Sequence, residues 1–200
     1  MTTFPIHTLS SAPAASKPAL QQLQDGFGFI PNVAGAIANS PVLMKTFAAV
    51  FANVHSGSFA EDEIQIVLLT DAVANSSAWA VAFHSALALK NQVSDEDVRA
   101  IREYRLPSAP KHAALSGLAR QLIEKRGHVS AEELQAFLNT GFKQGYILEI
   151  LTILAASTIT NSMNTLGPRK LRATCSSQCS STLINFACRC LCHPAPVTLS

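Results

Sequence analysis

The sequence predicts an all-α protein with a single domain built from roughly eight helices. Helix-start signals recur along the chain, in the form of capping boxes and of proline at the first position of a helix. No segment shows the apolar–polar alternation between turns that is typical of β-strands. With 200 residues, the chain is long enough for one domain with a substantial core.

In the first half of the chain, each helix is expected from its own start signal. Residues 1–15 are polar and contain two prolines, so we expect an extended arm there, followed by a helical domain over residues 16–166. A first helix is expected from Lys17, and Ser40 before Pro41 predicts the start of a second. The capping-box pattern Ser58-Phe-Ala-Glu61 predicts a helix to about residue 74, and 78–89 form the next one after a short break.

The second half of the chain shows the same kinds of helix start and stop signals. Ser94 is expected to cap a helix that ends before Pro107, and Pro110 to open one that Gly127 stops. A capping box at 130–133 predicts the next helix. The last expected helix, about 146–161, follows a turn between two glycines. Its apolar stretch 146–159 carries a glutamate and is too short to cross a bilayer, so a buried helix is the interpretation.

Composition narrows the possible partners. The formal net charge is +2, and no dense run of Lys and Arg with interleaved aromatic residues occurs, so we expect no nucleic-acid binding. The N-terminus lacks the basic start and apolar core of a secretory signal, which predicts a cytoplasmic protein without a membrane partner. Only 14% of the residues are charged, which favours a homo-oligomer with part of its surface covered.

Residues 167–200 differ from the rest of the chain. All five cysteines lie there, between Cys175 and Cys192, and the segment shows no helical period. Their spacing fits no common zinc pattern, so we expect a poorly ordered Cys-rich tail, no bound metal and no cofactor. Such a tail could be a lineage-specific extension or an ending altered by a shift of reading frame.

The segment 62–84 resembles the core motif of the carboxymuconolactone decarboxylase and AhpD-like alkylhydroperoxidase family. The segments Phe27-Gly-Phe-Ile-Pro-Asn32, Ser40-Pro-Val-Leu, Ser94-Asp-Glu-Asp and 141–164 are similar to other parts of the family pattern, in particular its peroxidase-related branch. The resemblance spans about 25–164. It implies a helical bundle, an alkylhydroperoxidase or decarboxylase activity, and assembly into dimers, trimers or hexamers.

The resemblance also implies a site that has lost its thiols. The family's glutamate, two cysteines and histidine correspond here to Gln65, Ser77, Ala80 and His84. Serine is a poor nucleophile without a base, alanine leaves no resolving thiol, and glutamine cannot relay a proton. Dithiol peroxidase activity is therefore not expected. Ser77, Ala80 and His84 follow at i, i+3 and i+7, on one stripe of a helix.

Each of these residues also has a simpler explanation. His84 is either a retained general acid or base or a histidine kept for packing and one hydrogen bond. For Ser77 the position of a helix N-cap is the stronger explanation, and it needs no catalytic role. Glu63 could replace the missing glutamate, but it lies about 200° around the helix from Gln65. Trp79 is expected at a pocket or subunit surface, whereas the other histidines receive no function: His7, His55, His112 and His128.

Three functions from different classes remain open. The first is a non-thiol enzyme that uses His84, with Ser77 or Gln65 orienting substrate or water, on a small organic acid or lactone. The second is a catalytically silent oligomer that binds a ligand or a partner. The third is a residual thiol oxidoreductase that uses the tail cysteines.

Overall fold

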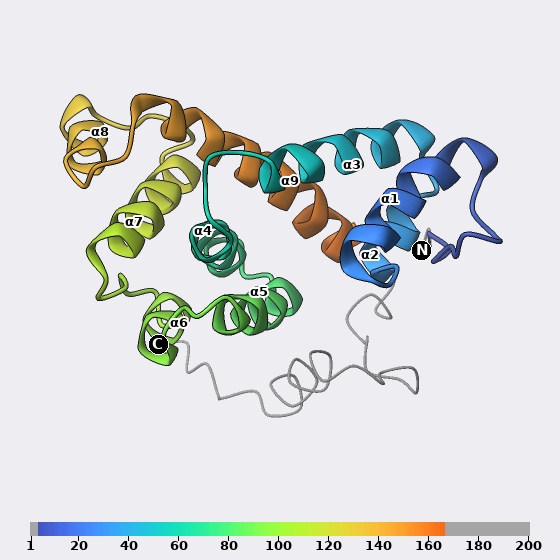
Figure 1. The fold of residues 1–200 in the computed structure, drawn as a ribbon, viewed down its shortest axis with the longest axis horizontal. Coiled ribbons are helices and arrows are strands. Elements are labelled where there is room, and N and C mark those ends of the chain that lie inside the picture. Colours follow the sequence, from blue (N-terminus) through green and yellow to red (C-terminus); the bar gives the residue numbers. More distant parts are fainter. Residues whose placement is uncertain (1–3, 167–200) are drawn as a thin grey trace.

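The computed structural model describes residues 4–166 of the chain, and its regular structure is entirely helical in that range. Figure 1 shows the arrangement. A short 3-10 helix, Ala14–Ser16, precedes nine α-helices: α1 (Lys17–Phe27), α2 (Asn32–Ile37), α3 (Pro41–His55), α4 (Glu61–Ala74), α5 (Ala78–Lys90), α6 (Asp95–Arg102), α7 (Pro110–Glu124), α8 (Ala131–Leu138) and α9 (Gln144–Leu166). The all-α prediction is confirmed, and the predicted tail lies outside the described residues.

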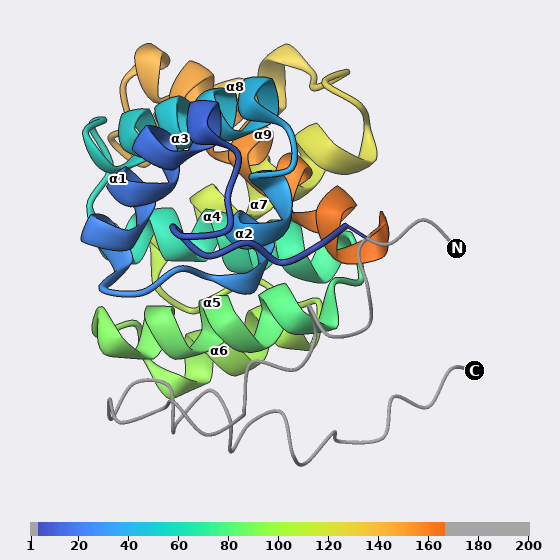
Figure 2. The ribbon, with the colours of Figure 1, turned by 90° about the vertical axis from the view of Figure 1, so that its right-hand side faces the viewer.

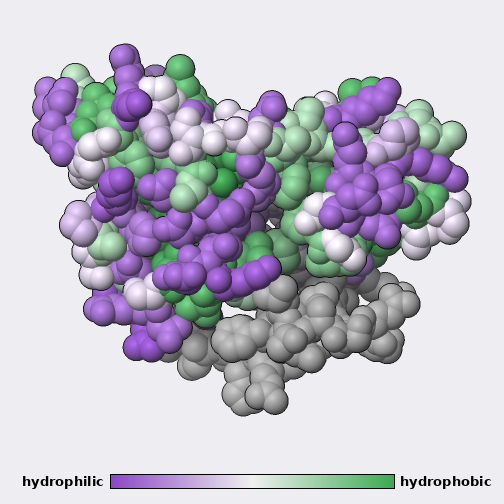
Figure 3. Space-filling model, viewed as in Figure 1, coloured by the Kyte–Doolittle hydropathy of each residue, from purple (hydrophilic) through white to green (hydrophobic). Residues whose placement is uncertain are grey.

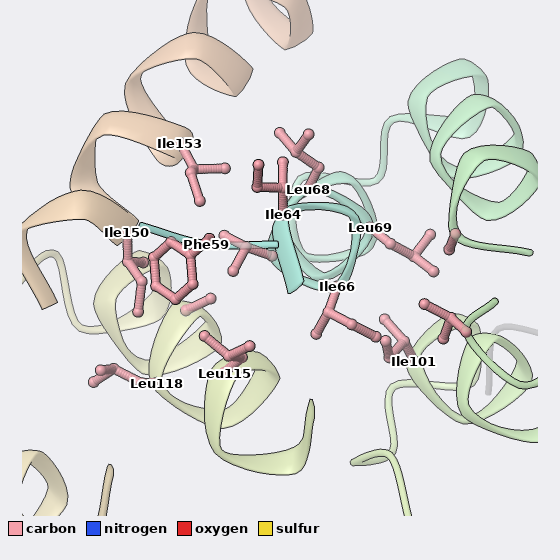
Figure 4. Close-up of a cluster of buried hydrophobic side chains, with 14 of the residues drawn as sticks. Phe59, Ile64, Ile66, Leu68, Leu69, Ile101, Leu115, Leu118, Ile150 and Ile153 are labelled. Carbon is pink, nitrogen blue, oxygen red and sulfur yellow. The ribbon is translucent and has the colours of Figure 1, made fainter. Parts of the chain in front are cut away.

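Helix α4 is the centre of the larger of two hydrophobic clusters. Every residue from Ile64 to Ala72 is buried, so the helix is covered on all sides rather than on one face. Helices α5, α6, α7 and α9 pack against it. Figure 4 shows its side chains pointing outward toward Ile101 of α6, Leu115 of α7 and Ile153 of α9. This placement puts the two helices of the predicted site, α4 and α5, in direct contact.

A second cluster joins α1, α2 and α3 to the C-terminal half of α9. The described part of the expected arm packs on it through Phe4, Ile6 and Leu9, and the His7 N–H donates to the Gly35 carbonyl over 3.1 Å. A Cβ on Gly35 would lie 2.7 Å from the His7 carbonyl oxygen, so glycine is required for this approach. Helix α4 lies with α3 on one side and α5 on the other (Figure 2).

Three of the predicted helix caps form as expected. Ser40 accepts from Leu43 N–H, Ser94 from Asp97 N–H and Ser130 from Glu133 N–H. Ser130 and Glu133 complete the predicted capping box, since Glu133 also accepts from the Ser130 N–H. Gly127 has a φ of +84°, a left-handed conformation that ends the preceding helix segment.

The predicted capping box at 58–61 is wrong. Helix α4 begins at Glu61, after Ala60, and the side chain that bonds its N-terminus is Glu63, which accepts from the Ala60 N–H. Ser58 instead donates its N–H and its hydroxyl to Glu149 of α9, each over 2.7 Å. A contact with a distant helix therefore replaces the local cap.

Helix α9 is longer than the predicted 146–161 and is buried on one face only. Leu148, Leu151 and Leu166 are exposed, among other apolar residues that are mixed with hydrophilic ones on the molecular surface (Figure 3). Within residues 4–166, α9 is also the one helix with the length and composition to cross a membrane, with a mean hydropathy of 1.3. The same composition is common in core helices of soluble proteins, and α9 packs on α2, α3 and α4.

Helix α2 was not expected from the sequence. It comprises six residues, and Val33 to Ile37 are all buried. A helix that is buried all round shows no amphipathic period, and Pro31 at its N-cap offers no side-chain acceptor.

Candidate functional site

A cavity lies where α3, α5 and α9 meet the segment from α1 to α2. It offers about 60 Å³ to the centres of water-sized molecules. One water needs about 10–15 Å³ by this measure, so several waters or a small organic molecule would fit. The walls are mainly aromatic and aliphatic; the aromatic side chains are Phe27, Phe47, Phe51, Trp79 and Phe83.

Four polar side chains interrupt these walls: His55, His84, Ser157 and Thr160. Trp79 and Phe83 both line the cavity and stack on each other with ring centroids 5.0 Å apart at 12°. The expectation of Trp79 at a pocket surface agrees with this position. An apolar cavity with a few polar groups is typical of sites for small organic ligands.

The structure brings two of the predicted site residues together. Gln65 of α4 is buried, and its Oε1 lies 3.0 Å from Nδ1 of His84 on α5. With this amide orientation, Nδ1–H donates to Gln65, and Nε2 is left as an acceptor. If the amide is turned end for end, its NH₂ donates to Nδ1 and Nε2 carries the hydrogen. Nε2 has no hydrogen-bond partner among the described residues.

His84 is held in its neutral form. Burial lowers its pKa from 6.5 to about 3, and charge repulsion from a protonated His55 would lower it further. The ring is half-buried by surface area because part of it borders the cavity. His84 thus presents to the cavity a neutral imidazole that can form a hydrogen bond, and protonating it is unfavourable.

Ser77 and Ala80 do not line the cavity. Ala80 is 1% exposed and packs in the interior. Ser77 stands at the N-cap position of α5, where its carbonyl accepts from the Val81 N–H but its hydroxyl makes no capping bond. The cap explanation for Ser77 therefore holds for its position and not for its side chain. Glu63 is engaged at the start of α4, away from His84.

Sequence reasoning missed the second histidine of the cavity. Nδ1 of His55, at the end of α3, lies 2.6 Å from Oε1 of Glu61, and the His55 ring packs on Phe51 at 4.3 Å. His55 and Glu61 are six residues apart across a loop, a spacing that belongs to no common motif. No signal in the sequence alone would have identified the pair.

A buried polar cluster behind the cavity wall was also missed. Asp71 of α4 accepts from Ser157 and Asn161 of α9 and from Asn75. Burial raises the Asp71 pKa, although these three hydrogen bonds oppose the shift. Ser157 belongs both to this cluster and to the cavity wall, so the cluster fixes α9 against α4 where the cavity forms.

The remaining histidines lie elsewhere. His112 is placed between Asp97 and Asp62, with Nδ1 and Nε2 3.3 and 3.4 Å from their carboxylates. No group of three or more His, Cys, Asp or Glu side chains suited to a metal ion is found among residues 4–166. The five cysteines lie outside the described residues.

The geometry defines the class to which the fold belongs, an all-α bundle of the AhpD type. One similar structure is the alkylhydroperoxidase AhpD core of an uncharacterized peroxidase-related protein from Ralstonia eutropha JMP134, with 20% identity and a TM-score of 0.71. That comparison covers 82% of this chain and 88% of the other. A peroxidase-related protein from Silicibacter sp. TM1040 is 15% identical with a TM-score of 0.69, covering 82% and 87%.

A third similar structure is the debrominase Bmp8, as a cysteine-to-alanine variant in complex with 2,3,4-tribromopyrrole. It is 15% identical, with a TM-score of 0.71, and the match covers 96% of this chain and 98% of the other. No family model and no curated protein matches the sequence. These likenesses show the fold, which is that expected from the sequence resemblance.

Proposed function

We propose that the protein is a non-thiol enzyme that binds a small, flat, mostly apolar molecule in the cavity and acts on a carbonyl group of it. A lactone or a small organic acid has the required chemistry. With the Gln65 amide turned so that its NH₂ donates to Nδ1, Nε2–H of His84 donates a hydrogen bond to the carbonyl oxygen, and Gln65 orients the His84 ring. The observation that carries the proposal is a neutral histidine, bonded to an amide, that borders an apolar cavity.

The walls support a ligand of this shape. Five aromatic side chains line the cavity, and a flat five-membered ring can pack against such rings by stacking or edge-to-face contact. The similarity to a debrominase in complex with a bromopyrrole supports a ring of that size. The single polar group of the ligand then meets His84, because a buried polar atom needs a hydrogen-bond partner.

The site residues support chemistry without thiols. Neither family cysteine position carries sulfur, since they are Ser77 and Ala80. Activity should therefore survive alkylation of the five tail cysteines with iodoacetamide. If alkylation abolishes turnover, the non-thiol assignment is wrong.

Binding can be followed through Trp79, the only tryptophan of the chain. A five-membered unsaturated lactone should change its fluorescence in a saturable way, and so should cyclopentene, which has the ring without the carbonyl. His84→Leu should weaken lactone binding about tenfold, since one hydrogen bond contributes about 0.5–1.5 kcal/mol, and leave cyclopentene binding unchanged. Equal effects of the substitution on both probes would exclude the assigned role of His84.

A second candidate is a protein that binds such a ligand without turnover. The low pKa of His84 favours it, because a histidine that stays neutral is a weak base. Saturable binding of the lactone with no change in the lactone itself would identify this function.

A further inference from the structure

His55 and Glu61 form a carboxylate–imidazole pair at the cavity. Nδ1 of His55 lies 2.6 Å from the Glu61 carboxylate, so Nδ1 carries the hydrogen and Nε2 is free to accept a proton. The His55 side chain is 27% exposed and lines the cavity. The pair thus connects the cavity to solvent, with which it can exchange protons.

The loop between the two residues is held in place by α9. Glu149 accepts from both the N–H and the hydroxyl of Ser58. A Cβ on Gly57 would lie 2.7 Å from the Glu149 carboxylate, so the loop passes too close for a larger residue without a shift. The position of Glu61 relative to His55 is therefore set by the fold.

The two histidines of the cavity have opposite surroundings. His84 is deep, has an amide partner and is kept neutral by burial, whereas His55 is near the surface and has a carboxylate partner. Two titratable groups in contrasting environments are the usual sign of divided roles in acid–base catalysis. His55 has its Nδ1 engaged by a carboxylate and its Nε2 without a hydrogen-bond partner among the described residues, so it is the one suited to take and return a proton.

We propose that His55, positioned by Glu61, is the proton-transferring base of the cavity, and that the reaction it supports is a proton shift within an unsaturated lactone. This inference rests on the proposed function, which supplies the ligand class and the hydrogen bond from His84.

The reaction needs no oxidant or reductant. Nε2 of His55 removes a proton from the ring carbon between the carbonyl and the double bond. The electron pair of that C–H bond moves into the ring, and the negative charge resides on the carbonyl oxygen, where Nε2–H of His84 donates a hydrogen bond. His55 then delivers a proton from Nε2, which exchanges with solvent, to the far carbon of the former double bond. The product is the conjugated isomer, and both histidines end in their starting states.

The test uses α-angelica lactone, a five-membered β,γ-unsaturated lactone, with the full chain. The conjugated isomer is followed by ultraviolet absorbance, and proton removal by deuterium uptake in D₂O. His55→Gln should lower the protein-dependent rate at least about 100-fold, within the usual range for one general base. His128→Gln is the matched control, because His128 is exposed and away from the cavity, and should keep the full rate.

Glu61 is tested as a positioning residue. Glu61→Gln should lower kcat about tenfold and leave the KM for the lactone unchanged, since an amide that can donate or accept no longer fixes the hydrogen on Nδ1 of His55. A merely structural role of Glu61 would raise KM as well, because the cavity itself would be disturbed.

The outcomes separate this inference from the proposed function. Saturable quenching of Trp79 by the lactone in wild type and in His55→Gln, with isomerisation only in wild type, supports both. Binding without isomerisation or deuterium uptake in wild type, or equal rates in wild type and His55→Gln, overturns the inference and leaves the binding site intact. Absence of lactone binding in wild type overturns the proposed function and the inference with it.

Discussion

Keeping His84 neutral should lower the free energy of unfolding at acidic pH. Its pKa falls from 6.5 to about 3 on folding, so the unfolded chain binds a proton that the folded chain refuses. Stability from this group is complete above about pH 6.5 and is lost as the pH falls toward 3. Relative to neutral pH, linkage gives a loss of about 1 kcal/mol near pH 5.5 and about 3 kcal/mol near pH 4.5.

The assay is urea unfolding of wild type and His84→Gln over that pH range, followed by circular dichroism. Glutamine can keep a hydrogen bond to Gln65 but does not titrate, so the substitution removes this contribution alone. The difference in unfolding free energy between the two proteins should shift in favour of the variant as the pH falls, by the amounts given above. All other titratable groups are the same in the two proteins. Parallel pH curves for wild type and variant would refute the burial argument for His84.

Three further predictions follow from the sequence and the described surface. The protein should be a homo-oligomer, because one face of α9 carries the exposed side chains Leu148, Leu151 and Leu166 and because charged residues are few. Light scattering should give a mass of at least twice 21.3 kDa, and a monomer at micromolar concentration would contradict this prediction. A chain truncated after Gly167 should keep a cooperative thermal unfolding transition near that of the full chain, because both hydrophobic clusters are formed by described residues. Loss of this transition would show that the core needs the tail. In this truncated, cysteine-free chain, the triple change Gln65→Glu, Ser77→Cys, Ala80→Cys should create a thiol that reacts with peroxide, whereas the truncated parent should stay inert. Peroxide turnover by that parent would mean that the site does not depend on thiols at these positions.

The caps show how far local chemistry predicts this fold. At Ser40, Ser94 and Ser130 the hydroxyl reaches an N–H three residues ahead, so the neighbouring residues alone determine the outcome. Ser58 has the same local pattern, but its hydroxyl bonds Glu149, 91 residues away. The carboxylate that the tertiary fold brings in accepts a charge-assisted hydrogen bond from the Ser58 hydroxyl, which then makes no cap, and the sequence gives no sign of its approach.

The contacts of the candidate site also fall into some that the sequence predicts and some that it does not. Gln65 and His84 could be paired from the sequence because the family motif fixes their spacing on two successive helices. His55 and Glu61 could not, since their contact depends on a loop that α9 holds in place. Asp71 with Ser157 and Asn161 also joins α4 to α9, across 86 and 90 residues of sequence. The contacts that could not be predicted from the sequence are those that depend on the last helix, α9.

The glutamine at position 65 changes what its histidine can do. A carboxylate only accepts, so a glutamate there would fix the hydrogen on Nδ1 of a neutral His84 and leave Nε2 as a base. An amide has both a donor and an acceptor, so Gln65 permits a neutral ring that donates from Nε2 into the cavity. Among the described residues, Glu61 is the one carboxylate that forms a hydrogen bond with a histidine of the cavity. In the proposed reaction, the deep histidine therefore binds an oxygen atom, and the outer one, with its own carboxylate, moves the proton.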